Sequence, residues 1–447
     1  MATETLAKWA TSLSYSDLPE SVIRAAIRSF YNWVGCAIGG SLHTATTIAH
    51  SSLEPFFGSP QSSLLGSQGG MKADAQHAAL LNGIASHVHD YDDTHLDTII
   101  HPTGLVASAL LAVSEWKRPV SGRDFILALV AGIEAECKLG LAVWPHHYDI
   151  GWHITSTTGS VGAAVAVGKV LGLDVVAMQH ATGVAATQVT GLREMFGSHT
   201  KSFHLGRAAQ NGLVAAVMAG GGFTSSLRAL EAKRGWVNVV STENRLEEVL
   251  ASLGTRWEVE RNAFKPFPCG IVVHPVVDGC VQARSKLADA SLRIEDVEVV
   301  DVHVHPLVLE LTGKTEPKDG LEGKFSVYHG AAVGLLYGKA TPAEYEDFVV
   351  LDPAVIEVRR KTRATVDESL RAGECHVRLD LGDNKIFEVH VDHAVGSLQS
   401  PMSDGQLQAK FLDQCGPVLG DEGASNASDA CWGLKQTQDV AGTAATL

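Results

Sequence analysis

The residue pattern of the chain changes near residue 262, and this change limits the folds that the chain can adopt. Before it, segments with the helical spacing of small and apolar residues follow one another. The segment AAQNGLVAAVMAGGG (208–222) is apolar almost all round, which is typical of a buried helix. After it, residues 297–305 are rich in β-branched side chains, and 376–381 and 386–391 alternate, as strands do. The sequence therefore predicts two domains, a large all-α helical domain and a smaller α+β domain.

We expect the all-helical domain over residues 1–261, completed by the C-terminal segment 397–447, and the α+β domain over 262–396. In the second domain we expect a helix over 325–337 and a hairpin that turns at Gly382-Asp383-Asn384. We expect the last dozen residues to be loose, because they are rich in small and polar side chains. The main helices expected in the first domain are 72–88, 105–116, 123–143, 154–171, 174–190 and 205–219.

Composition excludes several classes of protein. The formal charge is −15, from 50 acidic and 35 basic residues, and no basic stripe offsets it, so we expect no nucleic-acid partner. No apolar run approaches the roughly 18 residues that a membrane span needs, and the N-terminus lacks the pattern of a secretory signal. The seven cysteines are dispersed without a CxxC pair, which is typical of reduced thiols. We therefore expect a cytoplasmic protein without a membrane partner.

Polar side chains are densest in residues 87–104, where four His and four Asp lie within fifteen residues. A surface loop, a metal site and an acid–base site are the alternatives. His87 and His89 on a helix would point to opposite sides, and no HExxH motif completes a ligand set, so we expect no metal. Histidine titrates near neutrality and suits proton transfer. A neighbouring carboxylate such as Asp90 could orient the histidine that does this work.

Other segments place cationic or titratable residues beside Gly, Pro or hydroxyl residues. His153 begins a helix in GWHITSTTG (151–159), a position where N–H groups favour an anion. Lys201, His204 and Arg207 lie within 197–207, and Lys265 follows Phe264. Each segment also has a plain structural interpretation, as a helix cap or as a solvated basic loop. Together they suggest a locally basic pocket for an anion in an acidic chain.

Five motifs occur in a fixed order: DYDDTH followed by HPTG (90–104), GWHITSTTG (151–159), TKSFH (200–204), KPFPCG (265–270) and KFSVYHG (324–330). In this combination the chain resembles the MmgE/PrpD family, over about residues 6–399. Members of that family act as dehydratases, decarboxylases or epimerases on 2-methylcitrate, cis-aconitate or iminodisuccinate. The resemblance implies that the α+β domain closes as a lid over the helical domain, with the site between them, and that the protein is a homodimer.

The resemblance also implies roles for particular residues. We expect no metal or other cofactor, because lysines can neutralise the substrate carboxylates and the sequence has no nucleotide-binding fingerprint. Catalytic roles fall on His101, Asp90, His153 and Tyr328. Substrate-binding roles fall on Thr94, Lys201 and Lys265, to which we add the neighbouring His204 and Arg207.

These expectations lead to a cofactor-independent enzyme that transfers a proton alpha to a carboxylate of a small polycarboxylate. The chain length, the uninterrupted HPTG step and the DDTH sequence favour an epimerase of the iminodisuccinate type. A lyase of the same family, acting as a 2-methylcitrate dehydratase or a cis-aconitate decarboxylase, is the alternative. A non-catalytic carboxylate-binding protein is a third hypothesis, which predicts gaps in the motif set. The sequence does not show which arrangement of active-site groups is present, that of an epimerase or that of a lyase.

Overall fold

A computed structural model describes residues 1–67, 69–117, 119–383 and 385–447. The described chain forms two units, a helical unit (Met1–Val88, Asp92–Ala263 and Asp404–Leu447) and an α+β unit (His89–Tyr91 and Phe264–Ser403). The chain thus leaves the helical unit for three residues, His89 and the first two residues of the DYDDTH motif, and returns at Asp92. The boundaries expected from sequence were 261/262 and 396/397.

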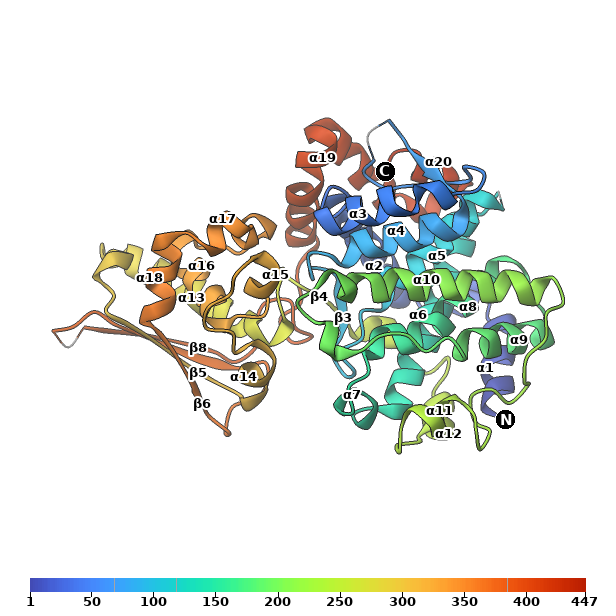
Figure 1. The fold of residues 1–447 in the computed structure, drawn as a ribbon, viewed down its shortest axis with the longest axis horizontal. Helices are drawn as coiled ribbons and strands as arrows, with labels where there is room; N and C mark the ends of the chain where they lie inside the picture. The colour runs from blue at the N-terminus through green and yellow to red at the C-terminus, as the bar shows by residue number, and fades with distance from the viewer. Residues whose placement is uncertain (68, 118, 384) are drawn as a thin grey trace. The chain divides into compact units, whose positions relative to one another are not determined.

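Close helix packing defines the centre of the helical unit. Helix α10 (His199–Gly220) packs against α4 (Ala75–His87) and α8 (Ile154–Val170), and it is the long green helix in Figure 1. A Cβ atom added to Gly83 of α4 would lie 2.5 Å from the Cα of Gly206 in α10. The small residues therefore allow the helix backbones to touch, as the sequence predicts.

The other elements of this unit surround that centre, and they include the short strand pair β1–β2. Its further helices are α1 (Ala2–Ser12), α2 (Glu20–Gly39), α3 (Thr44–Leu53), α5 (Pro102–Trp116), α6 (Gly122–Val143), α7 (His146–Asp149), α9 (Val175–Ala186), α11 (Trp236–Val240), α12 (Leu246–Leu250), α19 (Asp404–Trp432) and α20 (Val440–Ala444). Its strands are β1 (Ser62–Ser63), β2 (Lys72–Ala73), β3 (Asp93–His95) and β4 (Asn262–Phe264), whose last residue belongs to the α+β unit.

The six helices predicted for this unit correspond to α4, α5, α6, α8, α9 and α10. Helix α10 begins at His199, six residues before the predicted start, so Lys201 and His204 lie on a helix and not in a loop. The prediction of a loose C-terminal end is wrong. Val440 and Ala444 are buried in α20, because the small side chains of this segment fit against the unit.

The α+β unit is built on a four-stranded mixed sheet with the order β6-β5-β7-β8. Strand β5 pairs in parallel with β6 and antiparallel with β7, and β7 and β8 form an antiparallel hairpin. This hairpin was predicted, although Asn384 of its turn lies outside the described residues. The strands are β5 (Val299–Val304), β6 (Thr362–Val366), β7 (Cys375–Asp380) and β8 (Ile386–Val391). The helices are α13 (His274–Asp289), α14 (Pro306–Thr312), α15 (Gly320–Gly323), α16 (Val327–Tyr337), α17 (Asp347–Val350) and α18 (Pro353–Lys361).

The two faces of this sheet have different surroundings. Val300, Val302, Val377 and Leu379 belong to a buried core that includes residues of α13 and α16, and Figure 1 shows these helices together on one side of the strands. The residues that alternate with them, such as His376, point to the opposite face and are more exposed. Because helices cover one face of the sheet and the other face is more exposed, apolar and polar residues alternate along the strands.

Two further features bear on the environment of the chain. None of the helices in the described parts of the chain is both long enough and apolar enough to cross a membrane. All seven cysteines are buried as thiols, and burial raises the pKa of Cys36 and Cys269 to about 12. Neither thiol is therefore suited to act as a nucleophile near neutral pH.

Candidate active site

The loop between α4 and α5 positions the first part of the candidate site. His87 is the last residue of α4, and His101 directly precedes Pro102, the first residue of α5. Ile99 has a φ angle of 60°, which is unfavourable for a β-branched residue. The loop holds this conformation through backbone hydrogen bonds from His95 to Ile100 and from Ile99 to His95. The loop, which is strained at Ile99 and held by backbone hydrogen bonds, thus fixes the position of the His101 backbone.

Two histidines share one carboxylate at this loop. His87 Nδ1 lies 2.7 Å from Asp92 Oδ2, and both side chains are fully buried. His101 Nδ1 lies 3.6 Å from Asp92 Oδ1 and 2.7 Å from the backbone carbonyl of Asp93. A carbonyl oxygen can only accept, so the second contact requires a proton on Nδ1 of His101. In the neutral ring Nε2 is then the basic nitrogen. Thr94 Oγ1 lies 3.3 Å from the same Nδ1.

Asp93 is a buried residue of this loop, and its surroundings disfavour the ionised carboxylate. Thr103 and Asn262 both donate to its Oδ2. Burial, followed by repulsion from Asp92, raises the pKa of Asp93 to about 7. This carboxyl therefore holds a proton more readily than an ordinary aspartate does.

A second pair of histidines completes a group of four. Nδ1 of His153, which precedes α8, lies 3.1 Å from Nδ1 of His204 on α10. The His87 ring is 4.9 Å from the His101 ring and 6.2 Å from the His153 ring, between centroids. We call His87, His101, His153 and His204 the histidine cluster. All four are buried, and three of them were predicted as site residues.

Lys201 gives the histidine cluster a cationic neighbour. It is buried on α10, and its Nζ lies 5.4 Å from the centre of the Phe196 ring, which itself contacts the His153 ring. Burial, followed by the charge of Lys201, lowers the pKa of His153 well below its usual range. Burial and then the nearby His87 and Lys201 lower the pKa of His204 to about 4. In this state both rings are neutral at pH 7, and a bound anion would favour their protonation.

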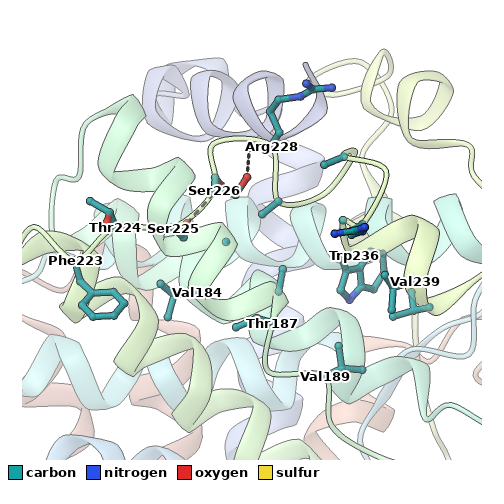
Figure 2. A pocket seen from close by; sticks show the side chains of 17 residues that line it. Val184, Thr187, Val189, Phe223, Thr224, Ser225, Ser226, Arg228, Trp236 and Val239 are labelled. Atoms are coloured by element: carbon teal, nitrogen blue, oxygen red, sulfur yellow. Dashed lines mark hydrogen bonds between the residues drawn. The ribbon is translucent and has the colours of Figure 1, made fainter.

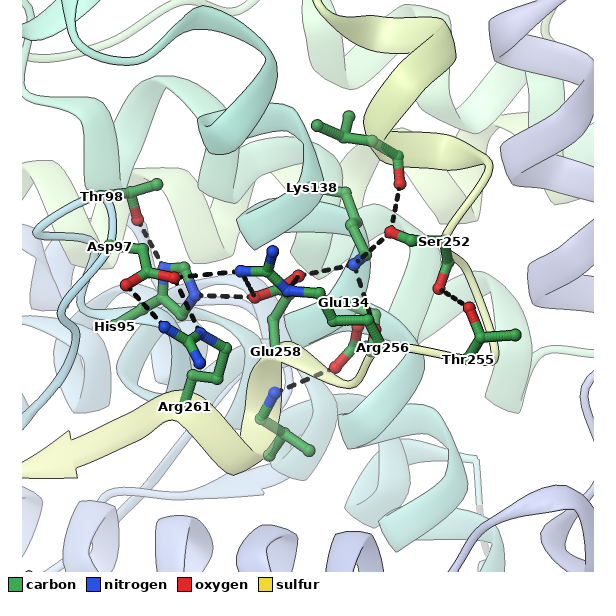
Figure 3. Close-up of polar contacts among 12 residues, drawn as sticks. His95, Asp97, Thr98, Glu134, Lys138, Ser252, Thr255, Arg256, Glu258 and Arg261 are labelled. Atoms are coloured by element: carbon green, nitrogen blue, oxygen red, sulfur yellow. Dashed lines mark hydrogen bonds and ion pairs between the residues drawn. The ribbon is translucent and has the colours of Figure 1, made fainter. Parts of the chain in front are cut away.

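His95, the last residue of the DDTH stretch, and the nearby Asp97 belong to a different network, which Figure 3 shows. His95 Nε2 lies 3.1 Å from Glu258 Oε2, and Lys138 Nζ lies 2.5 Å from Glu258 Oε1. Burial would raise the pKa of Glu258, but the hydrogen bonds from His95 and Lys138 outweigh it and lower this pKa to about 2. Arg261 grips Asp97 with two nitrogens, at 2.7 and 2.9 Å. This ionic network anchors the loop and uses side chains that a motif search would count as catalytic.

Two lysines hold the segment His89–Tyr91 within the α+β unit. Lys265 Nζ lies 2.7 Å from Asp90 Oδ1, and both side chains are almost fully buried. Lys324 Nζ donates to the carbonyl of His89 at 2.7 Å. Asp90 has a φ angle of 52°, a region that aspartate enters more readily than most residues. The predicted catalytic Asp90 and the predicted substrate-binding Lys265 thus form an ion pair.

The last two predicted residues have less distinctive surroundings. Tyr328 lies at the start of α16 and packs, partly buried, against the core of the α+β unit. Arg207 is exposed, and its guanidinium donates to Gln210 at 2.6 Å. No contact described for Arg207 joins it to the histidine cluster, so its role in binding substrate stays a prediction.

His87 and Asp92 are the residues that the sequence-based assignment missed. The sequence predicts that His87 and His89 point to opposite sides of a helix, so neither is assigned to the site, and the two histidines lie in different units. The available signal was the helical position of His87, one turn beyond Gly83, where α4 meets α10. A histidine at such a contact must face other buried groups.

Three clusters of described residues bring together groups that a metal ion could use: His87/Asp92/His101, His95/Asp97/Glu258 and Glu374/His376/His390. The first corrects the expectation that no ligand set forms around His87. In it, both Nδ1 atoms already donate within the protein, one to Asp92 and the other to the Asp93 carbonyl. Metal-free action of this group stays a prediction.

A separate cavity of about 530 Å³ lies between residues 183–189 and 223–240 of the helical unit. Figure 2 shows its mostly apolar lining, with Val184, Phe223 and Val239 among the labelled side chains. None of the predicted site residues lines it. Its lining offers no cluster of acid–base groups, so we place the candidate site at the histidine cluster.

Comparison with known proteins agrees with the motif order. A model of the MmgE/PrpD N-terminal domain matches residues 4–249, and a model of the C-terminal domain matches residues 267–434. The chain is 25% identical to a cis-aconitate decarboxylase of Aspergillus terreus, across 98% of this chain and 94% of that protein. It is 27% identical to the cis-aconitate decarboxylase of Mus musculus, across 93% and 87%. A shorter match, also at 25% identity, covers 23% of this chain and 22% of a 2-methylcitrate dehydratase of Cupriavidus necator.

Proposed function

Because the chain belongs to the MmgE/PrpD family, we propose that it is a lyase that acts next to a carboxylate of a small polycarboxylate. Relatives that match nearly the whole chain are named for the decarboxylation of cis-aconitate, so cis-aconitate is the first substrate to test. The observation that carries the proposal is the histidine cluster beside Lys201, buried within the helical unit. Such a group combines proton transfer with attraction for an anion.

The electrostatics of the histidine cluster suit an anionic substrate. The chain as a whole carries a formal charge of −15, so a polycarboxylate needs local cations in order to bind. Lys201 supplies one. His153 and His204 are neutral and share a hydrogen bond between their Nδ1 atoms, so the ring that donates in this bond can take up a proton at Nε2 when a carboxylate approaches. Substrate binding is therefore coupled to proton uptake in this proposal.

We assign the proton transfer itself to Nε2 of His101. In a decarboxylation the bond between carbon and the departing carboxylate breaks, carbon dioxide leaves, and the electron pair remains on the substrate. In cis-aconitate this pair moves across the adjacent double bond, and one carbon takes up a proton to give itaconate. Doubly protonated His101 can donate from Nε2 while Nδ1 keeps its bond to the Asp93 carbonyl. Asp92, at 3.6 Å, stabilises the charged ring.

The sequence favoured an epimerase, but the relatives found by comparison are lyases by name, so the lyase is the better supported reading. A non-catalytic carboxylate-binding protein predicts a gap in the motif set, and none of its positions is missing. The roles predicted for Asp90, Lys265 and Tyr328 stay predictions. We also expect turnover to survive exhaustive chelation and the protein to be a homodimer, with a sedimentation mass near twice 47.3 kDa.

The reaction can be tested by nuclear magnetic resonance in D₂O. The protein is incubated separately with cis-aconitate, 2-methylcitrate and iminodisuccinate stereoisomers. Decarboxylation gives itaconate that carries one solvent deuterium, and dehydration gives an alkene signal from 2-methylcitrate. Either result supports a lyase. Interconversion of the iminodisuccinate isomers with deuterium at Cα, and no loss of carbon or water, would replace the lyase by an epimerase.

Two controls make this test specific. His101→Asn should abolish the product signal, whereas His50→Gln, on helix α3, should leave it intact. If no substrate reacts or exchanges but cis-aconitate still binds, the binding-protein hypothesis replaces catalysis.

A further inference from the structure

The exposed face of the sheet in the α+β unit carries histidines on three neighbouring strands. His303 of β5 is the register partner of His376 in β7, and His376 is the register partner of His390 in β8. The three therefore form a row across the sheet. His376 and His390 are exposed, and none of the three belongs to the motifs that define the family resemblance.

Two members of this row and one carboxylate converge. The rings of His376 and His390 stack with centroids 4.2 Å apart and planes 8° apart. Glu374 Oε1 lies 2.8 Å from His390 Nε2. One ligand atom from each of the three residues lies within 4.8 Å of the others. The side chain of His390 is 46% exposed, so an ion can reach the group from solvent.

The strand geometry explains why these three side chains meet. Residues directly opposite each other on antiparallel strands have Cβ atoms about 4.5–5.5 Å apart. Glu374 precedes His376 by two residues and therefore points to the same face. Tetrahedral Zn²⁺ with bonds of about 2.0–2.1 Å places its ligand atoms roughly 3.3 Å apart. The present distances, from 2.8 Å between His390 Nε2 and Glu374 Oε1 up to at most 4.8 Å, bracket that value.

Arg371 orients the carboxylate without blocking it. Its Nε lies 3.1 Å from Glu374 Oε2, whereas the other oxygen, Oε1, faces His390. A carboxylate with one oxygen held by a neighbouring group is better oriented to bind a metal ion through its other oxygen. Arg371 also pairs with Asp392, so part of its positive charge is already balanced.

We propose that Glu374, His376 and His390 form a binding site for a divalent transition-metal ion of the Zn²⁺, Ni²⁺ and Cu²⁺ class. Two imidazoles and one carboxylate suit these ions, whereas Mg²⁺ and Ca²⁺ prefer sites made of oxygen ligands. The site lies wholly in the α+β unit and shares no residue with the histidine cluster of the helical unit. A bound ion would join β7 to the edge strand β8.

The test is calorimetric titration of the full-length protein with Zn²⁺, with Mg²⁺ as the contrasting ion. The double variant His376→Gln/His390→Gln should lose one Zn²⁺ site or bind it at least tenfold more weakly, and Glu374→Gln should weaken it less. Mg²⁺ should give no binding at this site. His50→Gln is the matched single-histidine control and should titrate like the unaltered protein.

A second measurement guards against a folding artefact. Saturating Zn²⁺ should raise the melting temperature of the unaltered protein more than that of the double variant, because binding only to the folded state stabilises it. Both exposed positions tolerate glutamine in a strand, so matching circular dichroism spectra are expected. Equal Zn²⁺ stoichiometry and affinity in the double variant and the unaltered protein would overturn the proposal, and so would an absence of Zn²⁺ binding in both.

Discussion

At His101 the two imidazole nitrogens have separate tasks, and a substitution can remove one task while sparing the other. Asparagine retains an amide donor near the position of Nδ1, which bonds to the Asp93 carbonyl, but it offers nothing at Nε2. For His101→Asn we predict a loss of kcat of about 10²–10⁴-fold, the usual contribution of general acid–base catalysis. KM should change much less, because the lost group acts in the transition state. Steady-state kinetics with cis-aconitate measures both, and near-normal kcat would remove the assignment.

Two buried glutamates on one network should respond very differently to the same substitution. Glu258 is ionised between Lys138 and His95, so Glu258→Gln leaves a buried cation without its carboxylate. We predict a cost of roughly 3 kcal/mol in the free energy of unfolding. Burial raises the pKa of Glu134 to about 8, so Glu134→Gln replaces a group that is already neutral at pH 7 and should cost less than about 1 kcal/mol. Urea unfolding at pH 7 compares them, and equal losses would contradict the assigned charge states.

At the scale of elements, the contact between α4 and α10 sets the position of His204. A Cβ at Gly206 would lie 2.2 Å from the backbone oxygen of Leu80, whereas a Cβ at Gly220 would meet only the end of the Leu173 side chain, at 3.2 Å. Gly206→Ala must therefore push the helices apart. We predict that it costs about 1–3 kcal/mol and lowers kcat, while Gly220→Ala leaves both nearly unchanged. Thermal unfolding and kinetics on the two variants check this, and a harmless Gly206→Ala would show that the helices can separate freely.

Hydrophobic periodicity predicted the buried part of α10 but not its beginning. Residues 208–219 present apolar side chains almost all round, so their pattern predicts a buried helix. In residues 199–207 the buried positions include Lys201 and His204, which are polar because they face the histidine cluster. A helix that lines a polar site lacks the apolar stripe by which helices are recognised. The polar residues of the site therefore concealed the beginning of α10 from a prediction based on apolar spacing.

At the scale of the whole molecule, the two-domain architecture could be predicted, because helices and strands each show their apolar spacing within a short stretch of sequence. The partners of buried charged residues could not be predicted in this way. Lys138 and Glu258 are separated by 120 residues, and no local spacing relates them. The same limit applies to Asp92, whose two histidine contacts depend on how the strained loop returns to α5. His101, His153 and Lys201 were assigned to the site through motif order, which needs no knowledge of the packing, and their roles stay predictions.

Buried groups that differ in protonation between the folded and unfolded chain determine how stability depends on pH. Burial raises the pKa of Asp93 to about 7 and that of Glu134 to about 8, whereas both ionise near pH 4 when unfolded. Burial lowers the pKa of His147, His204 and His329 to about 4, against about 6.5 when unfolded. Between about pH 4 and 6.5 the carboxyls favour folding at lower pH and the histidines favour it at higher pH, so these contributions oppose each other.

Above about pH 7 most of each histidine is neutral in both states, so the carboxyls contribute the larger share. The buried thiols, whose pKa is raised as well, act in the same direction as the carboxyls. The folded chain then holds protons that the unfolded chain has lost, so stability must fall as the pH rises. Each such proton contributes a slope of at most about 1.4 kcal/mol per pH unit. We predict that the urea midpoint falls from pH 7 to pH 8, and that Glu134→Gln, which cannot ionise, makes the decline shallower. A midpoint that rises over this range, or a decline of the same slope in Glu134→Gln, would mean that Glu134 is ionised in the folded protein.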